Sequence, residues 1–506
     1  MSEAYLATDK VEDRQTFSAA SGTVRRLLIC IVLYALPANI LVQPVVDPDI
    51  WWHMRTSEWI FEHRAVPTTD PFSRDGEAKP LEAYSWLFEV VVYSVYGQFG
   101  LQGILFVRIA LGMSVLASIH RFVASREPRF FMATVWTAAA FLAMTQVLIE
   151  RPWLFTILFC TFTLDVVLKL REGKPTQGMV WLPVCYLLWA NLHIQFIDGL
   201  AILALGCVAP VIDRWLKRAE GGSCSVLSGP PDRWKIRILA ATCFVATLIN
   251  PYHVGLYGVV FGYATDTQIY DLIQEFQALS FRYLSNWTLP VLLALACFTL
   301  GRSGRVSSFH VLLLAGSGYL SFHSQRDLWF GVLASLAILA PARIMPGRLT
   351  GTFAVTRWKA LLIAAMVVGV IVVLAWKRQL TEDQLWQKVG QRYPAQAAAV
   401  VETRGYEGPL FNDFDWGGYL IWRLRGLPVS MDGRTNVHGG QRTKEAIAIW
   451  MADPSWVNDP DLATAGVIIA NVKLPLTQLL RRDQRFELVH EDPVAVVFIA
   501  RRTPKP

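Results

Sequence analysis

Two aspartates separated by one proline are the residues of this sequence best suited to chemistry. Asp47, Pro48 and Asp49 follow directly after the first long apolar run. A proline biases the residue before it toward extended backbone, and residues i and i+2 of an extended segment point to the same face. Both carboxylates are therefore expected to face one site at the membrane surface, where a carboxylate is able to accept the proton of an acceptor hydroxyl.

A proton acceptor at a membrane surface suits a substrate with a membrane-borne leaving group. Lipid-linked phosphosugars have such a group, and their phosphate calls for arginine or lysine. Lys79, Arg151 and Arg326 are available on the predicted side of the aspartates. The sequence therefore predicts carboxylates beside cations at one edge of a membrane.

The elements that must position these residues are apolar helices. Of the 506 residues, 53% are hydrophobic and 17% are charged, whereas a soluble domain has about 25% charged residues. The apolar run 84–97 is short for a membrane span and contains Glu89, and we predict a re-entrant or interfacial helix there. Eleven other apolar runs are predicted membrane spans: 27–45, 101–123, 130–148, 153–170, 179–196, 200–216, 236–249, 288–300, 307–322, 328–344 and 358–376.

The positive charges of the loops indicate the orientation. Lys and Arg collect in cytoplasmic loops, and they fall on one side only if 84–97 does not cross. Residues 1–24 are then cytoplasmic, 25–376 form the membrane domain with a first outer loop at 46–100, and 377–506 form an extracytoplasmic domain. We expect an integral protein of a bacterial inner membrane, in contact with membrane lipids. The net charge of +7 reflects these loops, and no nucleic-acid partner is expected.

The same topology places five polar clusters on the outer side. Ionisable groups at membrane level usually mark a functional site, although helix caps and interfacial anchors are the alternative for any one cluster. The clusters are 47–49, 150–152, 191–193, 250–253 and 323–327.

The first outer loop has a recognisable layout. After the aspartates, residues 50–61 read as an amphipathic helix whose Trp51, Trp52 and Trp59 suit a membrane interface. Lys79-Pro80 and Tyr84-Ser-Trp-Leu87 precede the next helices. This arrangement resembles the GT-C superfamily of integral-membrane glycosyltransferases, above all the polyprenyl-phosphate-sugar-dependent enzymes of the protein O-mannosyltransferase and aminoarabinose-transferase types. Pro48-Asp49 stands where that family has a Pro-Asp-Glu motif, with Ile50 in place of the glutamate. Lys79-Pro80 resembles the Lys-Pro-Pro-Leu segment of the family, with Leu81 in place of the second proline.

The resemblance implies a GT-C-like fold and an inverting transfer. Asp49, with or without Asp47, would be the general base, and Lys79, Arg151 and Arg326 would hold the phosphate. The partners would be a polyprenyl-phosphate-sugar donor and a glycan, lipid or protein acceptor. A divalent cation, Mg²⁺ or Mn²⁺, is possible at Asp47 and Asp49, which have the DxD form. Candidate sugar or acceptor ligands are His53, Glu82, His193 and His253, with an interfacial hydrogen bond as the alternative for each histidine.

Residues 377–506 alternate helix and strand patterns, which predicts a small α/β domain. The predicted helices are 382–404, 416–425, 443–452 and 474–482, and the predicted strands are 409–412, 428–432, 466–470, 486–490 and 494–500. Two loops, 412–418 and 431–440, follow strands, where ligands of α/β sheets bind. Asp413, Asp432 and Arg434 are therefore candidate sugar or acceptor ligands, unless the loops only form turns and caps.

Two other classes of function remain open from the sequence. A transporter or flippase would also have many spans, but it often shows repeated halves and polar groups at mid-membrane, which this sequence lacks. A non-catalytic component of a polysaccharide export or assembly system would use the exported domain for binding.

Overall fold

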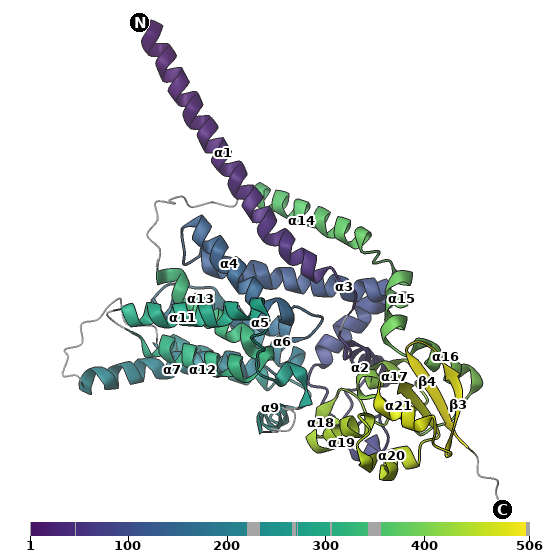
Figure 1. Cartoon of the computed structure of the whole chain (residues 1–506). Helices are drawn as coiled ribbons and strands as arrows, with labels where there is room; N and C mark the ends of the chain where they lie inside the picture. The colour runs from purple at the N-terminus through teal and green to yellow at the C-terminus, as the bar shows by residue number, and fades with distance from the viewer. Residues whose placement is uncertain are drawn as a thin grey trace, which may run out of the picture.

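The structure is a computed structural model that describes residues 2–45, 47–219, 233–265, 270, 272–303, 306–342 and 356–501, with backbone alone for 2–21, 217–219 and 233. Parts of three predicted basic loops, 214–237, 302–305 and 343–359, lie outside the described residues. The chain folds into a bundle of long helices followed by a small domain that contains the sheet (Figure 1).

Each predicted span corresponds to a helix of the bundle. Among the described residues, seven helices are long and apolar enough to cross a membrane: α1 (Ser2–Leu41), α3 (Trp86–Ala124), α4 (Phe130–Met144) with the 3-10 turn η2 (Thr145–Val147), α5 (Trp153–Arg171), α7 (Phe196–Ala219), α11 (Thr288–Arg302) preceded by η4 (Leu284–Trp287), and α14 (Arg357–Lys377). Four shorter helices occupy the other predicted runs: α6 (Gly178–Leu192), α8 (Arg233–Thr247), α12 (Ser308–His323) and α13 (Leu328–Ala342). The helical membrane fold is confirmed, and the count of eleven crossings stays a prediction.

The predicted interfacial helix 84–97 and the span after it are two halves of α3. Gly100 interrupts the helix with φ 60° and ψ −148°, a conformation that glycine adopts without steric cost. The Glu382 carboxylate accepts hydrogen bonds from the backbone N–H groups of Leu101 at 3.0 Å and Gln102 at 3.2 Å. A residue of the C-terminal domain therefore caps the second half of α3.

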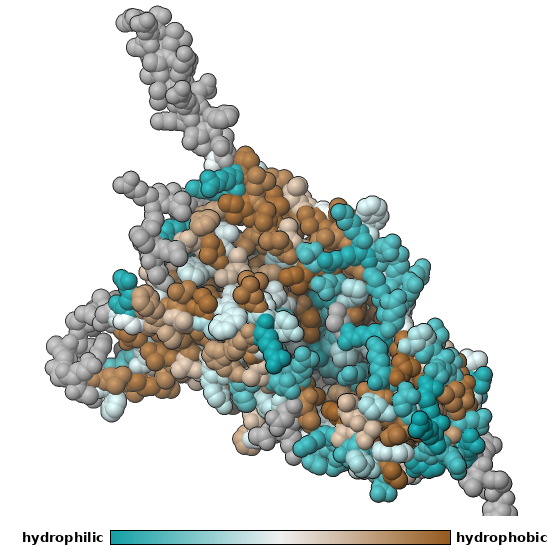
Figure 2. All heavy atoms as spheres, in the orientation of Figure 1, coloured by the Kyte–Doolittle hydropathy of each residue, from teal (hydrophilic) through white to brown (hydrophobic). Residues whose placement is uncertain are grey.

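The C-terminal domain contains a four-stranded sheet in the order β1-β2-β4-β3. β1 (Leu410–Asn412) and β2 (Val467–Asn471) are parallel, whereas β4 (Ala495–Ala500) runs antiparallel to both β2 and β3 (Phe486–Glu491). The helices around the sheet are α15 (Glu382–Arg392), α16 (Ala395–Arg404), α17 (Gly417–Arg423), α18 (Thr435–His438), α19 (Gly440–Trp450), α20 (Pro460–Ala463) and α21 (Pro475–Leu480). The predicted α/β character of this domain is confirmed, and polar side chains cover much of its surface (Figure 2).

Two elements predicted for this domain are wrong in detail. The predicted helix 382–404 is broken after α15, because Pro394 holds Tyr393 in extended backbone. The predicted strand 428–432 does not join the sheet. Instead, Val429 pairs with the first outer loop, where its N–H donates to Phe72 O at 3.1 Å and its carbonyl accepts from Arg74 N at 2.9 Å.

The amphipathic helix α2 (Ile50–His63) lies between the bundle and the C-terminal domain. Trp51 is fully buried, with its ring 5.1 Å from that of Tyr419 and 5.5 Å from that of Tyr393. Trp52 is also buried. The prediction that both tryptophans lie at the membrane interface is therefore wrong, because α17 and α15 of the C-terminal domain cover this face of the helix.

Candidate functional site

The loop that carries the two aspartates is held by a buried ion pair. Arg108, in α3, donates from Nη1 to Glu150 at 2.7 Å and to Pro44 O at 3.1 Å, and from Nη2 to Gln43 O. The other oxygen of Glu150 accepts from the backbone N–H of Asp47 at 3.0 Å. Arg108 therefore fixes this loop from the bundle side.

Arg151 joins the two aspartates. Its Nε lies 2.6 Å from Asp47 Oδ2 and its Nη1 lies 2.6 Å from Asp49 Oδ2. Glu275 approaches the third nitrogen at 3.4 Å. Asp47 also accepts the backbone N–H of Asp49 at 3.1 Å. Both carboxylates face one guanidinium, as expected, but residues 48 and 49 form a turn and not the extended backbone from which this was predicted.

The three carboxylates share one positive charge, and this affects their protonation. Burial raises the pKa of Asp49; Arg151 opposes this rise, and Glu275 adds to it. Burial raises the pKa of Asp47 as well, against the effect of Arg151. Asp49 is consequently a stronger base than an aspartate exposed to water.

A cavity of about 840 Å³ opens beside these aspartates. Its walls come from both domains, because the bundle and the loops of the C-terminal domain meet here. Four of the five predicted polar clusters contribute to it. The charged and histidine side chains along the wall are Asp47, Asp49, His53, Arg151, His193, Glu275, Arg326, Arg392, Asp413, Asp415 and Arg434.

Arg326 is the second cation of the bundle wall. Its guanidinium lies 5.4 Å from the centre of the Trp153 ring and 5.2 Å from that of Phe276. Its Nη2 lies 3.0 Å from His193 Nε2, and its Nε has no hydrogen-bond partner among the residues that the structure describes. Arg326 is therefore held by aromatic rings and a histidine rather than by a carboxylate.

Glycines of the C-terminal domain bring its loops against the aspartate loop. A Cβ at Gly433 would collide with the carboxylate of Asp49, and one at Gly418 would lie 3.0 Å from Pro48 O and 3.2 Å from Trp52. Both glycines lie in the loops for which turns and caps were the alternative prediction. Gly418 and Gly433 instead permit two close approaches between domains.

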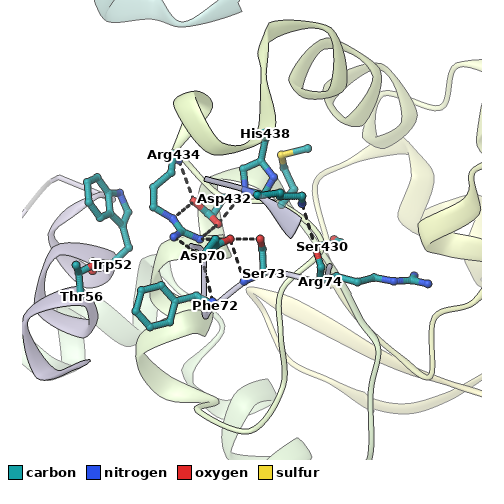
Figure 3. A network of polar contacts seen from close by, with 12 residues as sticks. Trp52, Thr56, Asp70, Phe72, Ser73, Arg74, Ser430, Asp432, Arg434 and His438 are labelled. Carbon is teal, nitrogen blue, oxygen red and sulfur yellow. Dashed lines mark hydrogen bonds and ion pairs between the residues drawn. The ribbon is translucent and has the colours of Figure 1, made fainter. Parts of the chain in front are cut away.

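Arg434 links the two domains through a buried network (Figure 3). It donates to Asp432 from Nε at 2.8 Å and from Nη2 at 2.7 Å, and to Asp70 of the first outer loop from Nη1 at 2.7 Å. His438 Nε2 lies 3.0 Å from Asp432. Burial alone would raise the pKa of Asp432, but Arg434 and His438 hold it well below its ordinary value. The primary contacts of Asp432 and Arg434 are thus with each other and with Asp70.

Several other predicted site residues lie outside the lining of the cavity. Lys79 donates from Nζ to Arg74 O at 3.1 Å. Glu82 lies beside a separate, much smaller cavity, and His253 is exposed with Nδ1 3.1 Å from Leu248 O. His53 does line the large cavity, and its Nδ1 lies 3.1 Å from Glu89.

Asp413 is a predicted site residue of the C-terminal domain that lines the cavity. Its carboxylate accepts from Asn471 Nδ2 at 3.1 Å and from Asp415 N at 3.4 Å. Burial, with the nearby charge of Asp415, raises its pKa to about 6. This carboxyl group is therefore able to change its charge near neutral pH.

Residues that the sequence did not single out complete the site. Glu275 lies in a connection without a motif, and no local pattern marks it. Asp70 precedes a proline and a serine, a pattern typical of a turn, and it accepts from Phe72 N at 3.0 Å and from the Ser73 hydroxyl. The role of Asp70 in linking the domains becomes visible only from its ion pair with Arg434.

A divalent cation held by the DxD aspartates does not fit this geometry. The guanidinium of Arg151 contacts an oxygen of each aspartate, where such a cation would have to bind. Across the described ranges, no cluster of three or more His, Cys, Asp or Glu side chains is arranged to hold a metal.

Comparison with known proteins shows the fold. No family model and no curated protein sequence matches the chain. It is similar to the solved structure of ArnT from Cupriavidus metallidurans bound to undecaprenyl phosphate, with 16% identity over 95% of this chain and 98% of that chain and a TM-score of 0.48. It is also similar to the archaeal oligosaccharyltransferase AglB from Archaeoglobus fulgidus, in complex with an inhibitory peptide and a dolichol-phosphate, with 11% identity over 88% of this chain and 69% of that chain and a TM-score of 0.51. The likeness to AglB concerns the fold alone.

Proposed function

We propose that this chain, which has the GT-C fold, transfers a sugar from a polyprenyl-phosphate-linked donor to an acceptor hydroxyl on the extracytoplasmic side of a membrane. The observation that carries the proposal is that Asp49, ion-paired with Arg151, shares one cavity with Arg326, and that both domains form the walls of this cavity. AglB, which shares the fold, was solved with a dolichol-phosphate. A cavity with a base, a cation and a second domain above it has the groups that such a transfer requires.

The difference in exposure between the aspartates supports Asp49 as the base. The side chain of Asp47 is fully buried, whereas that of Asp49 is 15% exposed and faces the cavity. Asp47 accepts the backbone N–H of Asp49, so it helps to set the position of the base. Arg151 holds both carboxylates in one orientation.

The steps of the transfer follow from these positions. Asp49 takes the proton of the acceptor hydroxyl, and the oxygen bonds to the anomeric carbon from the face opposite the phosphate. The bond from that carbon to the phosphate oxygen breaks, and the polyprenyl phosphate leaves with the electron pair. The configuration at the anomeric carbon inverts. Arg326 stabilises the negative charge of the leaving phosphate.

The acceptor would enter from the side of the C-terminal domain. Asp413, Asn471 and Trp450 line that part of the cavity, and polar groups beside an aromatic ring suit a glycan or another polar acceptor. The bundle side, with Arg326, Trp153 and Phe276, suits the donor phosphate.

Transfer assays with the full chain in lipid membranes test the proposal. Panels of polyprenyl-phosphate sugars and acceptors are supplied to the wild type and to Asp49→Asn. The asparagine keeps the size of the side chain but does not accept the proton, so we expect a loss of about 10²–10⁴ in rate. Wild-type rates in Asp49→Asn would remove the base assignment. Absence of transfer by the wild type with every donor would favour a transporter or an assembly component.

A further inference from the structure

A chain of buried hydrogen bonds leads from the interior of the bundle to Arg326. Trp189 Nε1 donates to Thr156 Oγ1 at 2.9 Å, Thr156 Oγ1 lies 2.9 Å from His193 Nδ1, and His193 Nε2 lies 3.0 Å from Arg326 Nη2. Trp189, Thr156 and His193 are each at most 1% exposed. The chain therefore ends in the cavity at a cation and is shielded from water elsewhere.

The chemistry of the partners fixes the proton positions along this chain. A guanidinium only donates hydrogen bonds, so His193 Nε2 accepts with its lone pair. The proton of a neutral imidazole then lies on Nδ1, which donates to Thr156 Oγ1. An indole also only donates, so Thr156 accepts from both Trp189 and His193 with its two lone pairs.

The two arginines on the bundle wall of the cavity, Arg151 and Arg326, differ in the groups that they already contact. Arg151 contacts three carboxylates. For Arg326, no ion pair is found within the described part of the chain, and its buried Nε has no partner. The carboxylate of its neighbour Asp327 accepts from Gln195 at 2.5 Å instead. Of these two, Arg326 is thus the guanidinium available to an anion.

We propose that His193 is a positioning residue: a neutral hydrogen-bond acceptor, fixed by Thr156, that orients Arg326 to bind the donor phosphate. This inference rests on the proposed function. It gives the two arginines different roles: Arg326 binds the phosphate, and Arg151 holds the aspartates in position. It also replaces the predicted role of His193 as a sugar or acceptor ligand.

The physical reason is preorganisation. A guanidinium free to rotate loses side-chain entropy when it binds a phosphate, whereas one held by a hydrogen bond and two rings has already lost it. Fixing Nη2 on His193 leaves Nε and Nη1 to donate to phosphate oxygens. Without the acceptor at position 193, Arg326 would also be free to turn toward the carboxylates that surround Arg151, or toward the carboxylate of Asp327.

Binding of undecaprenyl phosphate to the full chain in lipid nanodiscs tests the inference, with undecaprenol as the probe that lacks the phosphate. Thr156→Val keeps the shape of the side chain but removes the acceptor for His193. Thr161→Val is its matched control, because Thr161 is a buried threonine of the same helix that donates to Ile157 O at 2.7 Å. We expect about tenfold weaker binding of the phosphate probe for Thr156→Val and His193→Phe, and wild-type binding for Thr161→Val. His193→Gln, which restores an acceptor, should recover part of the loss.

Steady-state kinetics adds a readout that a loss of stability would not produce. The KM for the donor should rise in Thr156→Val and His193→Phe, with the KM for the acceptor unchanged. Wild-type affinity for undecaprenyl phosphate in both variants, or an equal loss in Thr161→Val, would overturn the inference. A wild type that binds undecaprenyl phosphate no more tightly than undecaprenol would instead overturn the proposed function.

Discussion

Gly433 lies directly against the carboxylate of Asp49: a Cβ at this position would collide with Oδ1 and lie 3.4 Å from Cγ. The two residues belong to different domains and are far apart in the sequence. The proposed base is therefore positioned by the C-terminal domain as well as by its own loop.

Gly433→Ala is expected to lower kcat by about 10²-fold, because the added methyl group displaces Asp49 and a displacement of about 1 Å can cost this much. Gly426→Ala is the control, since a Cβ there meets no atom within 4 Å. Both variants should fold, as judged by thermal unfolding in detergent. Equal activity of the two variants would show that the contact with Asp49 has no role in positioning it.

The pH dependence of transfer should reflect the raised pKa of Asp49. The base must be deprotonated, so activity should rise with pH through an apparent pKa above about 3.9, the ordinary value for aspartate. Glu275 raises the pKa of Asp49. Glu275→Gln should therefore move this acidic limb to lower pH, and Glu77→Gln, at an exposed position, should leave it in place. Measured kcat/KM against pH gives the answer, and a shift upward in Glu275→Gln would contradict the assignment.

Asp432→Asn should destabilise the fold by about 3–5 kcal/mol at neutral pH, because it leaves Arg434 buried with half of its ion pairing. The matched control is Asp483→Asn. Asp483 also pairs at 2.7 Å with an arginine two residues later, but Arg485 is 40% exposed and Arg434 is 1% exposed. The control should cost about 1 kcal/mol or less.

The same network gives stability a definite dependence on pH. The folded-state pKa of Asp432 is lowered, so its contribution is complete above the unfolded pKa of about 3.9 and is lost as pH falls through the folded value. Thermal unfolding at several pH values measures this. A difference between wild type and Asp432→Asn that grows on acidification would have the wrong sign.

Glu382→Ala should lower the stability of the contact between the domains by about 1–2 kcal/mol, because Glu382 caps the second half of α3 and compensates its dipole. Asp383→Ala removes a neighbouring, exposed acidic side chain and should have little effect. Hydrogen exchange of the amides of Leu101 and Gln102 reports the cap directly. Unchanged exchange in Glu382→Ala would exclude it.

Much of the fold was accessible from local patterns. Apolar runs predicted the helices of the bundle, and the period of residues 50–61 predicted α2, because hydrophobicity reports which side of a helix is buried. It did not report what buries it, and so the tryptophans of α2 were assigned to the membrane surface instead of to a contact with Tyr393 and Tyr419. The predicted strand 428–432 was wrong for a similar reason, since its extended backbone pairs with residues of the first outer loop.

The sequence by itself determined the helical membrane domain and the small α/β domain, because these depend on hydropathy and its period. It also indicated that Asp47 and Asp49 share one site, although a turn and not extended backbone brings them together. Only the tertiary structure decided that Arg151 holds those aspartates, that Arg434 joins Asp70 to Asp432 and that Gly433 approaches Asp49. Ion pairs and close approaches between distant segments depend on how whole elements pack, and no local period or spacing carries that information.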